Sequence, residues 1–116
     1  MKSILKVIVL ENCPYSIAAV ELLNNYKIKF NKIIVSREEK EKYKTEEIST
    51  FPQIYILNNS EQILLGGYSD IEEIVNIINQ SKNLDKIKKK LNIKYSKNVD
   101  KKIILRIIEL FAPYLI

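Results

Sequence analysis

Apolar and polar residues follow one another along the chain in blocks that predict strands alternating with helices. Residues 4–10 are an almost unbroken apolar run rich in valine and isoleucine, which is typical of a strand buried on both faces of a sheet. After Pro14, a residue favoured in the first turn of a helix, apolar residues recur near helical spacing from 17 to 23. Residues 30–35 predict a second strand.

The middle of the chain predicts a β-hairpin. Residues 37–47 are highly charged and predict no more than a short surface helix. Two apolar runs follow, at 53–57 and 62–65, and the four residues between them are polar and turn-forming. These two runs are therefore expected to pair as antiparallel strands.

An amphipathic helix is predicted over residues 70–79. Its start is marked by Ser69 with Glu72 three residues later, the pattern of a capping box. The resulting order is β-α-β-α-β-β-α, which predicts an α/β fold whose helices link the early strands and whose hairpin closes the sheet.

Two further helices are expected near the C-terminus. They span about residues 84–91 and 100–111, with a polar stretch around residues 95–98 between them. The second carries an apolar stripe made by Ile103, Ile104, Ile107, Ile108 and Phe111. We expect this stripe to pack against its own chain, and docking of a partner is the alternative.

Composition favours a small cytoplasmic protein. The 116 residues are 47% hydrophobic, enough for one modest core. No apolar stretch approaches the ~20 residues of a membrane span, and Lys6 interrupts what would be the apolar region of a secretory leader. The single cysteine excludes an intramolecular disulfide and favours a reducing compartment, the cytosol.

Positive charge is concentrated near the C-terminus. Residues 1–81 carry nine lysine or arginine residues against eleven acidic ones, whereas residues 82–116 carry ten against three. Such clustering can indicate a nucleic-acid or membrane contact, but on a helix it is more often a solvated face. We expect the solvated face and no nucleic-acid partner.

Cys13 is the candidate for chemistry. It lies where the first strand turns into a helix, and the unpaired N–H groups at a helix start favour a thiolate, the form that attacks disulfides. Glu11 works in the opposite direction, because a nearby carboxylate disfavours a second negative charge. Alternatively, Cys13 is only a small buried hydrophobic residue, the commonest role of a free cysteine.

Three motifs in order resemble the glutaredoxins. Cys13-Pro14-Tyr15-Ser16 is similar to their Cys-Pro-Tyr-Cys active site, with serine in place of the second cysteine. Thr50-Phe51-Pro52-Gln53-Ile54 resembles their Thr-Val-Pro segment, whose proline is cis, and Leu65-Gly66-Gly67-Tyr68-Ser69-Asp70 resembles their turn into the last helix. Each motif is short, and their order within the predicted strands and helices makes the resemblance specific.

The resemblance implies a thioredoxin-like three-layer α/β fold, a four-stranded mixed sheet flanked by helices, with extra C-terminal helices. Residues 1–81 would form the glutaredoxin-like domain and residues 82–116 a lysine-rich helical extension. It also implies an enzyme that uses glutathione as co-substrate to reduce glutathionylated proteins or small disulfides. Cys13 would be the nucleophile, and Ser16 leaves only a monothiol cycle, because it cannot resolve a mixed disulfide.

The same resemblance places the glutathione contacts. The peptide would add to the edge at Phe51, and its ammonium group would meet Asp70. Leu10 stands where the family usually carries a cation for the glycine carboxylate, so Arg37 or Lys40 would supply it. The expected glutathione-binding residues are Arg37, Lys40, Thr50, Phe51, Pro52, Gly67, Tyr68, Ser69 and Asp70.

A second function stays open on the sequence alone. Some single-thiol glutaredoxins carry a 2Fe-2S cluster between two chains, with Cys13 of each chain and two glutathione thiols as ligands by this resemblance. We rank this second, because dedicated carriers have Cys-Gly-Phe-Ser where Pro14 stands here. A monomer is expected for the reductase and a dimer for the cluster carrier.

Overall fold

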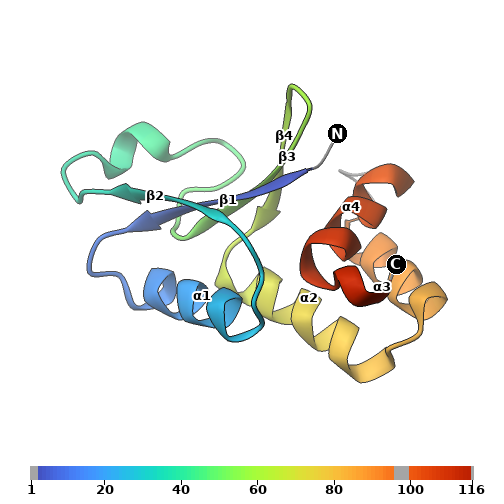
Figure 1. Cartoon of the computed structure of the whole chain (residues 1–116). Helices are drawn as coiled ribbons and strands as arrows, with labels where there is room; N and C mark the ends of the chain where they lie inside the picture. Colours follow the sequence, from blue (N-terminus) through green and yellow to red (C-terminus); the bar gives the residue numbers. More distant parts are fainter. Residues whose placement is uncertain (1–2, 96–99, 116) are drawn as a thin grey trace. The chain divides into compact units, whose positions relative to one another are not determined.

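A four-stranded mixed sheet forms the first part of the molecule in the computed structural model, which describes residues 3–95 and 100–115 (Figure 1). The strands are β1 (Ile4–Leu10), β2 (Asn31–Val35), β3 (Gln53–Asn58) and β4 (Glu61–Gly66). Their order is β2-β1-β3-β4, with β1 parallel to β2 and antiparallel to β3, and β3 antiparallel to β4. The predicted hairpin is therefore β3–β4.

Helix α1 (Pro14–Asn25) connects the two parallel strands and lies against one face of the sheet (Figure 1). Its buried residues Ala19 and Leu23 are four apart and share one side of the helix. On β1 and β3, Val7, Ile54 and Ile56 are fully buried or nearly so. The continuous apolar run of β1 is explained by its central place between β2 and β3.

The charged stretch after β2 forms only the single turn of 3₁₀ helix η1 (Lys40–Tyr43). None of its residues is fully buried, and Tyr43, which packs partly buried against the sheet, is its one apolar side chain, too little to support a longer helix. The prediction of a short surface helix is met by this one turn.

Helix α2 (Tyr68–Ser81) begins two residues earlier than predicted. The Gly67 carbonyl accepts the first helical hydrogen bond, from the Ile71 N–H at 3.3 Å, and the Gly67 N–H donates to Asp70 Oδ2 at 2.9 Å. Ser69 lies inside the first turn, so the capping box predicted at Ser69 and Glu72 was wrong about where the helix starts. The Asp70 carboxylate satisfies the N–H at the start of this helix instead.

The chain divides into two compact units, residues 1–71 and 72–116, and the division falls within α2. The second unit contains α3 (Leu84–Tyr95), α4 (Lys101–Phe111) and the short η2 (Pro113–Leu115). Every residue of the predicted apolar stripe on α4 is buried. The domain boundary after residue 81 stays a prediction.

The sequence predicted both C-terminal helices, but the ends of the helices in the structure differ from the predicted ones. Helix α3 continues to Tyr95, four residues beyond the predicted end, and residues 96–98 of the predicted linker lie outside the described part of the chain. Asp100 caps α4 by accepting the Ile103 N–H at 3.1 Å. None of the helices in the described ranges is long and apolar enough to cross a membrane.

Candidate redox site

Cys13 occupies the N-cap position of α1, and a two-residue turn separates it from the end of β1. Asn12 turns the chain with a positive φ of 54°, a conformation that asparagine tolerates better than most residues. Pro14 then starts the helix, and the Cys13 carbonyl accepts the Ile17 N–H at 3.0 Å. The thiol is therefore held at the positive end of α1.

Ser16 connects the cysteine to the end of β1. It is 2% exposed, and its Oγ accepts the Leu10 N–H at 3.1 Å while its hydroxyl is directed to the Cys13 sulfur. Burial raises the pKa of the Cys13 thiol. Hydrogen bonds from the N–H and hydroxyl of Ser16 and the N–H of Tyr15, with the charge of Arg37, outweigh burial and hold the pKa below its usual value.

Arg37 and Glu11 are hydrogen-bonded to each other close to Cys13. The Arg37 guanidinium donates to the Asn12 carbonyl at 3.0 Å, and the Arg37 backbone N–H donates to the Glu11 carboxylate at 3.1 Å. The charge of Arg37 favours the thiolate, as stated above. The sequence left the balance at Cys13 open, and the hydrogen bonds from Ser16 and Tyr15, with the charge of Arg37, shift it in favour of the thiolate.

The cysteine is not a core residue. It is only partly buried and packs against a small cluster formed by Ile8, Leu10, Val35 and Tyr55. Its Sγ lies 4.0 Å from the Phe51 carbonyl oxygen, and the Phe51–Pro52 peptide bond is cis, as the resemblance implies. The loop before β3 thus lies directly beside the thiol.

A groove of about 410 Å³ lies beside this loop. It is lined by Tyr15, Glu47, Ile48, Thr50, Phe51, Leu64, Gly66, Gly67, Tyr68, Ser69 and Asp70. The rings of Tyr15 and Tyr68 flank it, with centroids 6.3 Å apart. The groove thus brings together most of the predicted glutathione-binding residues, but Arg37, Lys40 and Pro52 are not among its described lining.

Four lining residues were missed by sequence reasoning: Glu47, Ile48, Leu64 and Gly66, the last of which stood in the glycine motif but was not assigned to the site. Glu47 and Ile48 stand just before the Thr50-Phe51-Pro52 segment, and that proximity was the one available signal. Leu64 lies on β4 and reaches the groove only because β3 and β4 pair. The contact roles of all these residues stay predictions.

Replacing Ser16 by alanine should move the pH dependence of Cys13 alkylation to higher pH. The change removes a hydrogen bond that lowers the thiol pKa, so reactivity with iodoacetamide near neutral pH should fall while the plateau at high pH remains. It also leaves the buried Leu10 N–H without its acceptor, which should cost about 1–3 kcal/mol of stability. Ser36→Ala is the control, since that hydroxyl is bonded to Glu39. An unchanged alkylation profile in Ser16→Ala would contradict this role.

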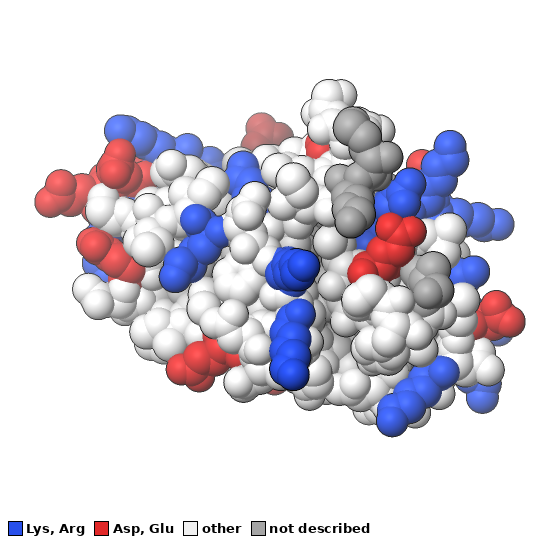
Figure 2. All heavy atoms as spheres, in the orientation of Figure 1, with Lys and Arg blue, Asp and Glu red and all other residues white. Residues whose placement is uncertain are grey.

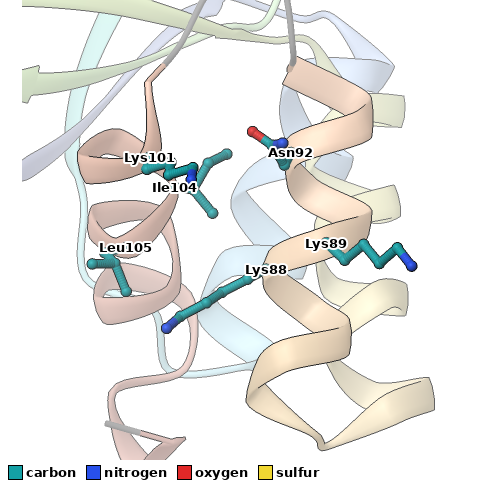
Figure 3. A pocket seen from close by; sticks show the side chains of 6 residues that line it. All are labelled: Lys88, Lys89, Asn92, Lys101, Ile104 and Leu105. Carbon is teal, nitrogen blue, oxygen red and sulfur yellow. The ribbon is translucent and has the colours of Figure 1, made fainter.

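A separate hollow of about 360 Å³ lies between α3 and α4 in the second unit. Figure 3 shows Lys88 extending from α3 toward α4, Asn92 directed into the gap and Lys89 pointing away from it. Its described lining contains no cysteine and no carboxylate. The redox candidate is therefore confined to the first unit.

Basic side chains are spread over the surface. On the face drawn in Figure 2, lysine and arginine side chains lie among neutral and acidic ones. In the second unit, Lys94 forms an ion pair with Glu73 at 3.1 Å, and Arg106 forms one with Glu109 at 3.1 Å. This distribution is typical of a solvated basic surface.

A thiol at a helix start, beside the cis-proline loop that leads into an interior strand of a mixed sheet, defines a thioredoxin-like protein with a single-cysteine site. The family model for glutaredoxin matches residues 4–61, half of the chain, and this chain belongs to the glutaredoxin family. The crystal structure of glutaredoxin 1 from Francisella tularensis complexed with cacodylate is similar, with a TM-score of 0.53 and 22% identity. The match covers 68% of this chain and 99% of that chain. No curated protein matches.

Both the family resemblance and the predicted fold class, a four-stranded mixed sheet flanked by helices, are thereby confirmed. Members of this family are oxidoreductases that use glutathione.

Proposed function

We propose that this chain reduces glutathionylated proteins and small mixed disulfides by a monothiol cycle through Cys13. The observation that carries the proposal is the partly buried Cys13 thiol with a lowered pKa, hydrogen-bonded by Ser16 at the start of α1. A lowered pKa raises the thiolate fraction, and the thiolate is the attacking species. A lone thiol of this kind also persists best in a reducing compartment, which supports a cytoplasmic location.

The cycle needs one cysteine and two exchange steps. The Cys13 thiolate attacks the glutathione sulfur of a mixed disulfide, a Cys13–glutathione disulfide forms, and the substrate leaves as a thiolate that takes up a proton. The thiolate of a second glutathione then attacks the glutathione sulfur on Cys13, which releases oxidised glutathione and restores the Cys13 thiolate. Because both steps run on one chain, a monomer suffices.

Two features of the groove support binding of glutathione there. Phe51, which lies next to the thiol in the segment before β3 and lines the groove, would offer its backbone groups to an extended peptide. Asp70 places a carboxylate at the other end, where the γ-glutamyl ammonium group would pair with it. Arg37, held at the Asn12 carbonyl, and Lys40 are the candidate cations for the glycine carboxylate.

Intact-protein mass spectrometry tests the proposal. Reduced protein mixed with a neutral glutathionylated peptide and quenched with acid should carry one glutathione on Cys13, and added free glutathione should remove it. An adduct with the peptide instead would mean attack on the wrong sulfur and would contradict the proposed cycle.

The iron–sulfur alternative gives a different result. Among the described residues, no group of three or more histidine, cysteine, aspartate or glutamate side chains could hold a metal, so a cluster would need two chains and external thiols. A brown protein after anaerobic purification that forms no glutathione adduct would reject the reductase and support the cluster carrier.

A further inference from the structure

The groove beside Cys13 is acidic. Its described lining includes two carboxylates, Glu47 and Asp70, and no lysine or arginine. Any charged substrate that enters the groove therefore meets negative charge first, and in a concave site with partly apolar walls such charges are screened less than on an open surface.

The two carboxylates differ in their availability. Asp70 Oδ2 accepts the Gly67 N–H at 2.9 Å and so holds the start of α2. Glu47 follows a turn in which its own backbone N–H donates to Thr45 Oγ1 at 3.2 Å, and no residue in the described ranges pairs with its carboxylate. Glu47 is thus a second groove carboxylate, besides Asp70, that can pair with a ligand, and it has no structural role in holding a helix start.

The negative charge of Glu47 acts on Tyr55, a residue that Cys13 packs against. Burial raises the pKa of the Tyr55 hydroxyl, and the negative charge of Glu47 raises it further. Tyr55 belongs to the apolar cluster against which Cys13 packs. Arg37 is the opposing positive charge near Cys13, and it acts from outside the described groove lining.

We propose that Glu47 is a specificity-determining residue that makes Cys13 react faster with disulfides carrying a positive charge than with anionic ones. The substrates this favours are mixed disulfides on basic peptide segments and cationic small disulfides. The inference rests on the proposed function in using the Cys13 thiolate as nucleophile, but it concerns which disulfide enters the groove. The reaction is one exchange: the Cys13 sulfur bonds to one sulfur of the disulfide, the S–S bond breaks, and the other half leaves as a thiolate.

Three disulfides of similar size and different charge test this selectivity. They are cystamine, which is cationic, bis(2-hydroxyethyl) disulfide, which is neutral, and 3,3′-dithiodipropionate, which is anionic. Reduced protein reacts with each in single-turnover experiments without glutathione, and each rate is divided by the rate for free 2-mercaptoethanol to remove intrinsic reactivity. The cationic-to-anionic ratio should be about tenfold above unity at low salt and should decline as salt is added.

Glu47→Gln is the decisive variant, and Glu46→Gln is its matched control. Both positions are exposed and both variants lose one negative charge, but only Glu47 lines the groove. The ratio should fall by about threefold or more in Glu47→Gln and stay at the wild-type value in Glu46→Gln. A ratio near unity in the wild type, or equal ratios in the two variants, would overturn the proposal.

This experiment separates the inference from the proposed function. If free glutathione failed to regenerate Cys13 while the charge ranking and its dependence on Glu47 persisted, the glutathione cycle would fail and the selectivity would stand. If glutathione turnover were normal but the cationic disulfide reacted no faster than the anionic one, the glutathione cycle would stand and the proposed charge selectivity would be rejected.

Discussion

Replacing Cys13 by alanine should reduce turnover in a glutathione-coupled mixed-disulfide assay by at least about a thousandfold, to the uncatalysed rate. The chain has no other cysteine, so no second thiol can take over the attack. Serine at position 16 cannot do so either, because a hydroxyl is far less acidic than a thiol and forms no disulfide. Removing an enzyme's nucleophile typically costs several orders of magnitude in rate. The measurement is the initial rate of NADPH consumption with glutathione reductase present.

Ser16→Ala is the natural comparison for this loss. It removes a hydrogen bond to the thiolate but keeps the nucleophile, so much of the turnover should remain and should recover further as the pH is raised. If Cys13→Ala retained turnover well above the uncatalysed rate, the assignment of Cys13 as the nucleophile would be rejected.

The fold was predictable because its signals are local and repeated. The apolar run of β1, the polar interval between β3 and β4, and the helical spacing in α2 each depend on neighbouring residues. The start of α2 was misplaced because two capping patterns compete there. Ser69 with Glu72 matches a capping box, but Asp70 is placed to accept the Gly67 N–H, and only the chain path from β4 decides between them.

The candidate site was predictable only in part. Cys13 and Pro52 could be assigned because they stand in short motifs with a fixed order. The protonation state of the thiol could not be assigned, because it is a balance between burial and the hydrogen bonds from Ser16 and Tyr15. The charge of Arg37 adds to this balance, and Arg37 lies 25 residues beyond Asn12, which it contacts through the parallel pairing of β1 and β2. Glu47 was missed for a similar reason: its place in the groove follows from the loop before β3, where the sequence carries no regular pattern.

The two adjacent glycines show what the structure adds to the family motif. The family motif has glycine at both positions, 66 and 67, and the sequence analysis assigned only Gly67 to the binding site. Gly66 has a φ of +125°, which side-chain-bearing residues rarely adopt, whereas Gly67 has no positive φ. A methyl group added at Gly66 would overlap the Asp70 carboxyl group and come within 2.8 Å of its Cβ. At Gly67 it would meet the Pro52 carbonyl at an ordinary 3.5 Å.

Gly66→Ala should therefore destabilise the protein by about 2–4 kcal/mol, the sum of a strained backbone and a displaced Asp70. Because Asp70 would leave its bond to the Gly67 N–H, the start of α2 should loosen and the KM for glutathione should rise along with the loss of stability. Urea unfolding measures the first effect and steady-state kinetics the second. Gly67→Ala, one residue away, should stay within about 1 kcal/mol of wild type. Equal losses in the two variants would show that the motif needs small residues at both positions, and that the positive φ of Gly66 is not what makes its glycine necessary.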